Sequence, residues 1–147
     1  MKSYSTLKTV LITKLEGILG QDSEALFVNV YSAEVTDQTG YPCAFVIESA
    51  GDGSLLDTAR NEREWQFEIE ILHEVGRMKP EDVSDSIIDA VDRVLESFDA
   101  DPQLTVAGVN NAKKVVVVPV EIDFGTRVGG YSRAVLMISI VDIVQRF

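Results

Sequence analysis

The segment NEREWQFEIEILHEV, residues 61–75, alternates polar and apolar residues without interruption from Glu64 to Ile71. A period of two is typical of a β-strand with one buried face and one hydrated face. The sequence therefore predicts a strand over residues 61–75 that covers a core on one side only. The face expected to be buried carries Trp65, Phe67, Ile69 and Ile71, and the hydrated face carries Glu64, Gln66, Glu68 and Glu70.

Two amphipathic helices and several further strands accompany this segment. Apolar residues at three- and four-residue spacing predict a helix over residues 5–19, ended by Gly20. A second helix is expected to have Pro80 in its first turn, to expose an acidic surface and to end near residues 99–102. Further strands are predicted over residues 25–32, 41–49, 104–109, 113–124 and 131–147, with turns or loops at 33–40, 50–62 and 125–130.

This order of elements indicates the fold class. Most successive strands have no helix between them, which favours antiparallel pairing. A chain of 147 residues suits one domain. We therefore expect a single α+β domain over residues 1–147, with a mostly antiparallel sheet and two helices packed on one face.

Two of the predicted strands are apolar on both faces. These are the run at residues 115–120 and the final strand from residue 131. If helices cover one face only, either a folded-over part of the same sheet or a neighbouring subunit must cover part of the other. Pro119 removes one backbone donor, so its strand is expected at an edge or at a bulge.

Composition excludes several classes of function. The net charge of −11 argues against binding nucleic acid through its phosphates, and fits either simple solubility or a surface that repels polyanions. The lone Cys43 allows neither an internal disulfide nor a cysteine zinc site. The first 20 residues resemble an amphipathic helix rather than a signal peptide, and no apolar run approaches the ~18 residues of a membrane span. We expect a soluble protein, cytoplasmic when made.

Catalytic chemistry finds little support in the residues. The single histidine, His73, falls on the apolar face of its strand, and Cys43 lies in an apolar strand without a motif around it. Glu68 and Glu70 are about 6.8 Å apart at ~3.4 Å per residue, a spacing that suits paired glycosidase carboxylates, but the aromatic residues lie on the opposite face. We expect no enzymatic activity and no catalytic, cofactor or metal site.

The element order and several segments resemble the tail terminator, or tail completion, proteins of long-tailed bacteriophages. The resemblance extends over nearly the whole chain. It rests on the N-terminal amphipathic helix, YPCAFVIES at 41–49, NEREWQFEIEIL after a loop expected to be mobile, the central helix, and YSRAVLMISIV at 131–141.

The resemblance implies a non-enzymatic virion protein of the tail or neck, assembled in the host cytoplasm. It would form a homohexameric ring that caps the tail tube, ends tube polymerisation and joins the tail to the head connector, with DNA passing through the bore. A negative wall would let DNA pass without adhering. Two other classes stay open: a small α+β enzyme or ligand-binding domain that uses carboxylates, and another neck or connector component.

Two sets of candidate residues follow from this interpretation. The acids expected to face a channel are Glu64, Glu68, Glu70, Glu121 and Asp123. The loop expected to contact a partner contains Asp52, Leu55, Leu56, Asp57 and Arg60.

Overall fold

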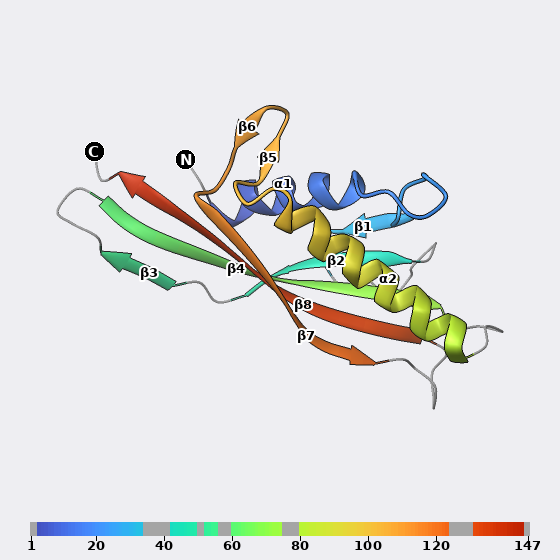
Figure 1. The fold of residues 1–147 in the computed structure, drawn as a ribbon. Coiled ribbons are helices and arrows are strands. Elements are labelled where there is room, and N and C mark those ends of the chain that lie inside the picture. Colours follow the sequence, from blue (N-terminus) through green and yellow to red (C-terminus); the bar gives the residue numbers. More distant parts are fainter. Residues whose placement is uncertain are drawn as a thin grey trace.

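The fold consists of two helices packed against one face of a twisted sheet (Figure 1). The structure, a computed structural model, describes residues 3–33, 42–49, 52–55, 60–74, 80–123 and 131–145. The helices are α1 (Tyr4–Glu16) and α2 (Pro80–Asp99). The strands are β1 (Asn29–Tyr31), β2 (Cys43–Glu48), β3 (Asp52–Leu55), β4 (Arg60–Glu74), β5 (Thr105–Val106), β6 (Val109–Asn110), β7 (Lys114–Asp123) and β8 (Tyr131–Gln145). The prediction of an α+β fold is confirmed.

The main sheet has the order β1-β2-β4-β8-β7, and β3 pairs with the first part of β4. The centre of the sheet is the antiparallel ladder between β4 and β8, which runs the full length of both strands. β2, β3 and β7 also pair antiparallel with their neighbours, whereas β1 is parallel to β2. The expectation of a mostly antiparallel sheet is therefore correct for the described strands.

The core lies between the helices and the alternating apolar residues of β4 and β8. In the register of these strands, Trp65 is opposite Ile140, and Phe67 is opposite Ile138. All four pack in one cluster with the inner faces of α1 and α2. The face predicted to be buried from residue 65 to residue 71 is thus the face that packs against the helices.

Helix α1 is shorter than predicted, because it ends at Glu16 rather than near Gly20. Ser3 caps its start, and the Ser3 and Thr6 side chains each bond the other residue's backbone N–H. Gly17 closes its end: its N–H is shared between the carbonyls of Thr13 and Lys14, and the N–H of Ile18 donates to the carbonyl of Leu15. Leu19, the last residue of the predicted range 5–19, lies beyond the helix and is 55% exposed.

Helix α2 begins at Pro80 and ends just before the Asp101-Pro102 pair, as predicted. A buried stripe of Ile87, Val91, Val94 and Phe98 fixes its orientation on the sheet. The neighbouring Ile88 is exposed, because it lies one residue off the inward-facing side of the helix.

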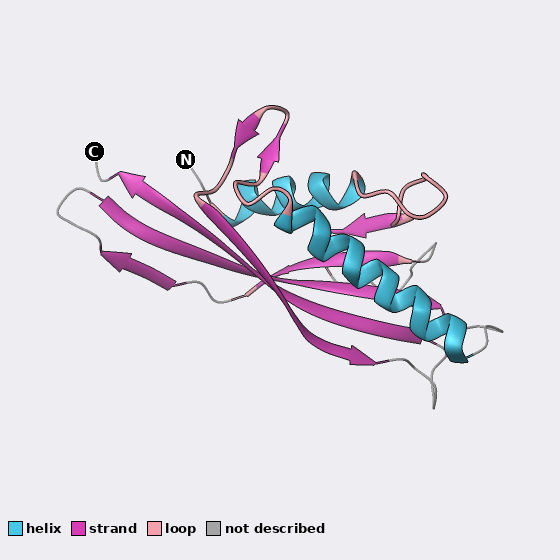
Figure 2. Cartoon of the chain, viewed as in Figure 1, coloured by secondary structure: helices cyan, strands magenta, loops and turns pink. Residues whose placement is uncertain are grey.

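Two strand predictions are wrong in detail. Residues 52–55, predicted as part of a loop, form β3 and pair with β4 away from both helices (Figure 1). Residues 104–109, predicted as one strand, instead contribute to a small β5–β6 hairpin that stands apart from the main sheet (Figure 2). Ala107 and Gly108 both have positive φ, as the central residues of a type I′ turn require.

Strand β7 is the outermost strand on its side of the sheet, as Pro119 predicted. The register against β8 shifts between Pro119 and Glu121, so the proline lies beside a bulge. Pro119 is opposite Leu136 and Glu121 is opposite Val135, so Val120 between them has no direct partner on β8.

Candidate functional site: the helix-free face of the sheet

The sheet face opposite the helices carries the acids that the sequence singled out. Directly paired residues of neighbouring strands project from the same side of a sheet, so the register assigns each residue to a face. We call this side the helix-free face. Its residues from Glu64 to Leu72 of β4 and across from them are Glu64, Gln66, Glu68, Glu70 and Leu72 on β4; Arg133, Val135, Met137, Ser139 and Val141 on β8; and Lys114, Val116, Val118, Glu121 and Asp123 on β7.

Glu64 and Glu68 are half-buried on this face. The Gln66 side-chain amide donates to Glu64 Oε1 over 3.2 Å. Glu68 lies between Ile47 of β2 and Met137 of β8 in the register. Each acid therefore stands beside polar or apolar neighbours and not in a dense cluster of carboxylates.

Glu70 differs from the other acids of β4, and the prediction that it is hydrated is wrong. Its exposed fraction is only 8%. The Arg133 guanidinium donates from Nε to Glu70 Oε1 over 2.8 Å. Glu70 thus occupies a nearly dry position in which a cation from β8 compensates its charge.

Arg133 also connects Glu70 to the two acids predicted on β7. A second nitrogen of its guanidinium lies 3.7 Å from Glu121 Oε2, and Asp123 is opposite Arg133 in the register. The structure therefore brings Glu70, Glu121 and Asp123 together around one arginine, whereas Glu64 and Glu68 lie further along β4. Sequence reasoning missed Arg133, although a cation inside the apolar run of β8 was a signal that an acid lies across from it.

The helix-free face also has its own apolar cluster. Cys43, Phe45 and Val135 belong to this face by register and are all buried. The ring of Tyr31 stacks on Phe45 with centroids 5.3 Å apart. Burial, with a smaller contribution from the negative Glu70, raises the pKa of the Cys43 thiol to about 11. The face is therefore a mixture of aliphatic and acidic side chains and not a uniform acidic wall.

The predicted partner-contact loop is only partly described. Asp52 and Leu55 are the first and last residues of β3, and Arg60 begins β4. Leu56 and Asp57 lie outside the described residues. The segment is thus in part a β-hairpin and not wholly a loop, and its expected contact with a partner stays a prediction.

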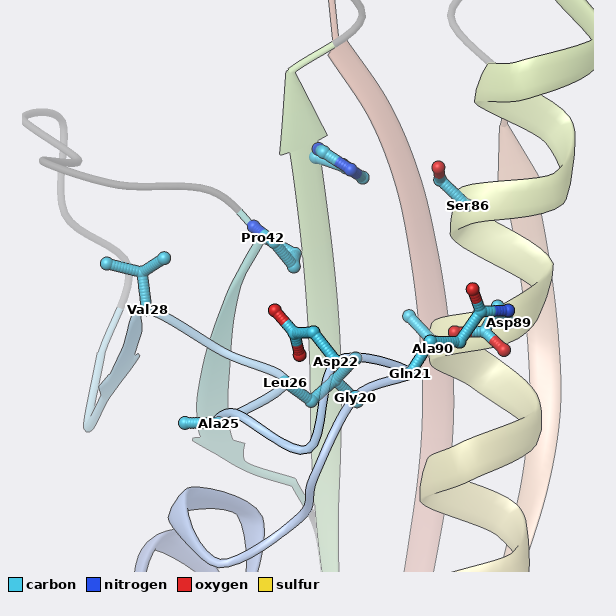
Figure 3. A pocket seen from close by; sticks show the side chains of 11 residues that line it. Gly20, Gln21, Asp22, Ala25, Leu26, Val28, Pro42, Ser86, Asp89 and Ala90 are labelled. Atoms are coloured by element: carbon cyan, nitrogen blue, oxygen red, sulfur yellow. The ribbon is translucent and has the colours of Figure 1, made fainter.

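A separate pocket of about 500 Å³ opens between α2 and the connector from α1 to β1. Figure 3 shows Ser86, Asp89 and Ala90 of α2 on one side and Asp22, Leu26 and Pro42 on the other.

His73, at the end of β4, completes the pocket lining. Its Nδ1 is buried and has no hydrogen-bond partner among the residues that the structure describes. Burial lowers the pKa of His73, and the nearby carboxylate of Glu74 opposes that shift. On the other side of the pocket, Asp89 is paired with Arg93 over 2.9 Å.

Among the residues that the structure describes, no group of three or more His, Cys, Asp or Glu side chains is arranged to hold a metal ion. No described helix combines the length and the apolar character needed to span a bilayer. The sequence matches no protein-family model and no curated protein.

Proposed function

We propose that this chain is a structural subunit of a phage tail, which assembles into a ring on the end of the tail tube. The ring ends polymerisation of the tube protein and joins the tail to the head connector. The resemblance of the element order to tail terminator proteins supports this proposal. So does one structural observation: the outer strand β7 exposes Val116, Val118 and Val120, as expected of a protein that associates with other subunits.

In this proposal the helix-free face contributes to the wall of the DNA passage. Five acids of this face, Glu64, Glu68, Glu70, Glu121 and Asp123, outnumber its two cations, Arg133, which pairs with Glu70 and Glu121, and Lys114. A wall of the same sign as DNA releases no counterions on contact, so it offers no gain for adhesion. The acids therefore keep the passing polyanion mobile.

The direct test is tube assembly in the presence and absence of the chain. Purified tail tube protein is polymerised with increasing amounts of the chain, and tube lengths are measured by electron microscopy. We expect shorter tubes with extra density at one end, because a bound ring stops addition of subunits. An unrelated acidic protein of similar size is the control. Unchanged length distributions together with bare tube ends would refute the proposal.

The pocket beside α2 favours a second candidate function, the binding of a small ligand. The specific observation is the unpartnered Nδ1 of His73, since a buried polar atom without a partner is costly. A fragment screen by ligand-observed NMR, repeated with His73→Phe, tests this function. Hits that the substitution abolishes would favour it, and a screen without hits would leave the structural role as the better proposal.

A further inference from the structure

The edge of the sheet at β7 and the edge at β1 differ in charge, and both expose aliphatic side chains. On the β7 edge, the exposed fractions are 39% for Val116, 51% for Val118 and 63% for Val120. Edge strands of soluble proteins are normally protected by charges or by a covering segment, because their unpaired backbone groups can pair with another chain. Pro119 and its bulge interrupt the backbone edge of β7, but the middle of the strand still exposes the side chains of three valines.

The opposite edge is formed by β1 and by the connector that leads to it from α1 (Figure 1). Val28, which directly precedes β1, is 58% exposed and also borders the pocket beside α2. Leu19 lies earlier in the connector and is 55% exposed, and its carbonyl accepts a hydrogen bond from Arg93 of α2. Asp22 and Glu24 are exposed in the same connector. This edge therefore combines aliphatic surface with negative charge.

The β7 edge has the complementary charge. Lys113 and Lys114 are exposed at its start, and no ion pair includes either of them in the part of the chain whose side chains are described. The other basic side chains in that part, Lys8, Lys14, Arg93 and Arg133, are all paired with acids. The chain has a net charge of −11, and these two lysines form a small positive patch beside the exposed valines.

We propose that the β7 edge of one copy docks on the β1 edge of a second copy. Lys113 and Lys114 then face the neighbour's Asp22 and Glu24, and the exposed valines of β7 face its Leu19 and Val28. Because the two edges differ, the contact is heterologous, and repetition generates a closed ring when the rotation between subunits allows closure. This inference rests on the proposed function, which supplies the ring, and it adds the surfaces through which neighbouring subunits contact each other.

Charge exchange between the edges tests this pairing. Lys113→Glu with Lys114→Glu makes the β7 edge negative. Asp22→Asn with Glu24→Lys makes the β1 edge positive, and the amide introduced at position 22 retains an oxygen for the bond that Asp22 accepts from the Glu24 N–H. Association is measured by sedimentation velocity and native mass spectrometry. Each double variant alone is expected to weaken association by about tenfold or more, since like charges then face each other.

The two double variants mixed in equal amounts should reassociate, because each repelling edge then meets a complementary one. The four substitutions combined in one chain should restore association for the same reason. The control is Asp92→Asn with Glu96→Lys on the exposed surface of α2. It changes the charge by the same amount as Asp22→Asn with Glu24→Lys, but away from both edges, and should leave association unchanged.

The aliphatic contribution has its own matched pair of variants. Val120→Asp on β7 is expected to abolish association. Val109→Asp replaces a valine of similar exposure, 59%, on the β5–β6 hairpin and should leave association intact. Circular dichroism is the check on folding, and each variant should be folded because the substitutions are at exposed positions.

The outcomes separate this inference from the proposed function. Rings that survive both charge reversals would overturn the edge pairing while leaving the capping role in place. Charge-dependent association without any effect on tail tubes would support the pairing and refute the capping role. A dimer that is lost in Val120→Asp but insensitive to changes at Asp22 and Glu24 would mean that two β7 strands pair with each other, and would overturn the inference. A wild-type chain that stays monomeric up to millimolar concentration would overturn it as well.

Discussion

Arg133 reaches from β8 to Glu70 on β4 and closes a 2.8 Å ion pair between an arginine whose side chain is 40% exposed and a glutamate whose side chain is 10% exposed. If its partner is removed, the arginine can therefore be hydrated by solvent much better than the glutamate can. If Glu70 is removed, Arg133 can still turn to solvent or to Glu121. If Arg133 is removed, the Glu70 carboxylate is left nearly dry and uncompensated.

This asymmetry predicts unequal costs for the two single substitutions. Arg133→Met should lower the free energy of unfolding by roughly 2–3 kcal/mol, because it leaves a buried charge unpaired. Glu70→Gln should cost about 1 kcal/mol or less, since the remaining arginine is partly hydrated. Urea denaturation followed by circular dichroism measures both. Equal costs, or a larger cost for Glu70→Gln, would show that burial of the acid does not dominate the pair.

Cys43 should be inert in the native protein. It is fully buried, and its pKa of about 11 leaves almost no thiolate at neutral pH. We expect an aromatic disulfide reagent such as Ellman's reagent to react with it only at the rate of global or local unfolding. Adding urea should accelerate the reaction in step with the unfolded fraction. Fast stoichiometric labelling at neutral pH without urea would contradict the burial of this thiol.

His73 should make the free energy of unfolding depend on pH, from its ordinary pKa of 6.5 down to its lower pKa in the folded state. Its pKa is lowered in the folded state, so protonation favours the unfolded chain. The stability from neutral His73 is fully present above its ordinary pKa of 6.5, and it is lost as the pH falls through the lower folded-state value. Free energies of unfolding measured from pH 7.5 to 5 should fall in the wild type and fall less in His73→Gln. Parallel pH profiles would contradict this role.

The acids of β4 are predicted to matter for DNA passage and little for folding. Glu64→Lys with Glu68→Lys should cost at most about 1 kcal/mol, because half-exposed charges contribute weakly to stability. If the chain forms the proposed ring, complete virions carrying both lysines should eject DNA more slowly, and added salt should reduce the difference. Normal ejection from such particles would reject a bore-facing position for β4.

The control for ejection is the pair Asp92→Lys and Glu96→Lys. These substitutions change the total charge by the same amount on the exposed surface of α2. They should leave ejection at the wild-type rate. If they slow ejection as much as the β4 variants do, net charge and not position is responsible.

The periodicity of the sequence correctly predicts features that depend only on the residues within a single helix or strand. The face of β4 that carries Trp65 and Phe67 follows from alternation, and the inner surface of α2 follows from its apolar stripe. Pro119 indicated an edge or a bulge, because a residue without an N–H cannot donate to a ladder. In each case the constraint lies within a few consecutive residues.

The parts that failed depend on what lies across from a residue. Alternation placed Glu70 on the helix-free face, but its burial depends on Phe45 and Val135, its neighbours on β2 and β8. Its charge is compensated by Arg133, which is 63 residues away in the sequence. The β5–β6 hairpin was missed for a different reason: its turn consists of Ala107 and Gly108, and alanine is not a usual signal for positive φ.

The place of β8 in the sheet has a consequence for how the chain folds during synthesis. β8 follows every other described strand in the sequence, yet it lies between β4 and β7. Pairs such as Arg60 with Gln145 join residues that leave the ribosome far apart in time. Until β8 emerges, β4 and β7 each present an unpaired edge, and closing such distant contacts is slow. The nascent chain therefore passes through a stage in which β4 and β7 both lack their common partner, and at that stage the unpaired edges are open to pairing with another chain.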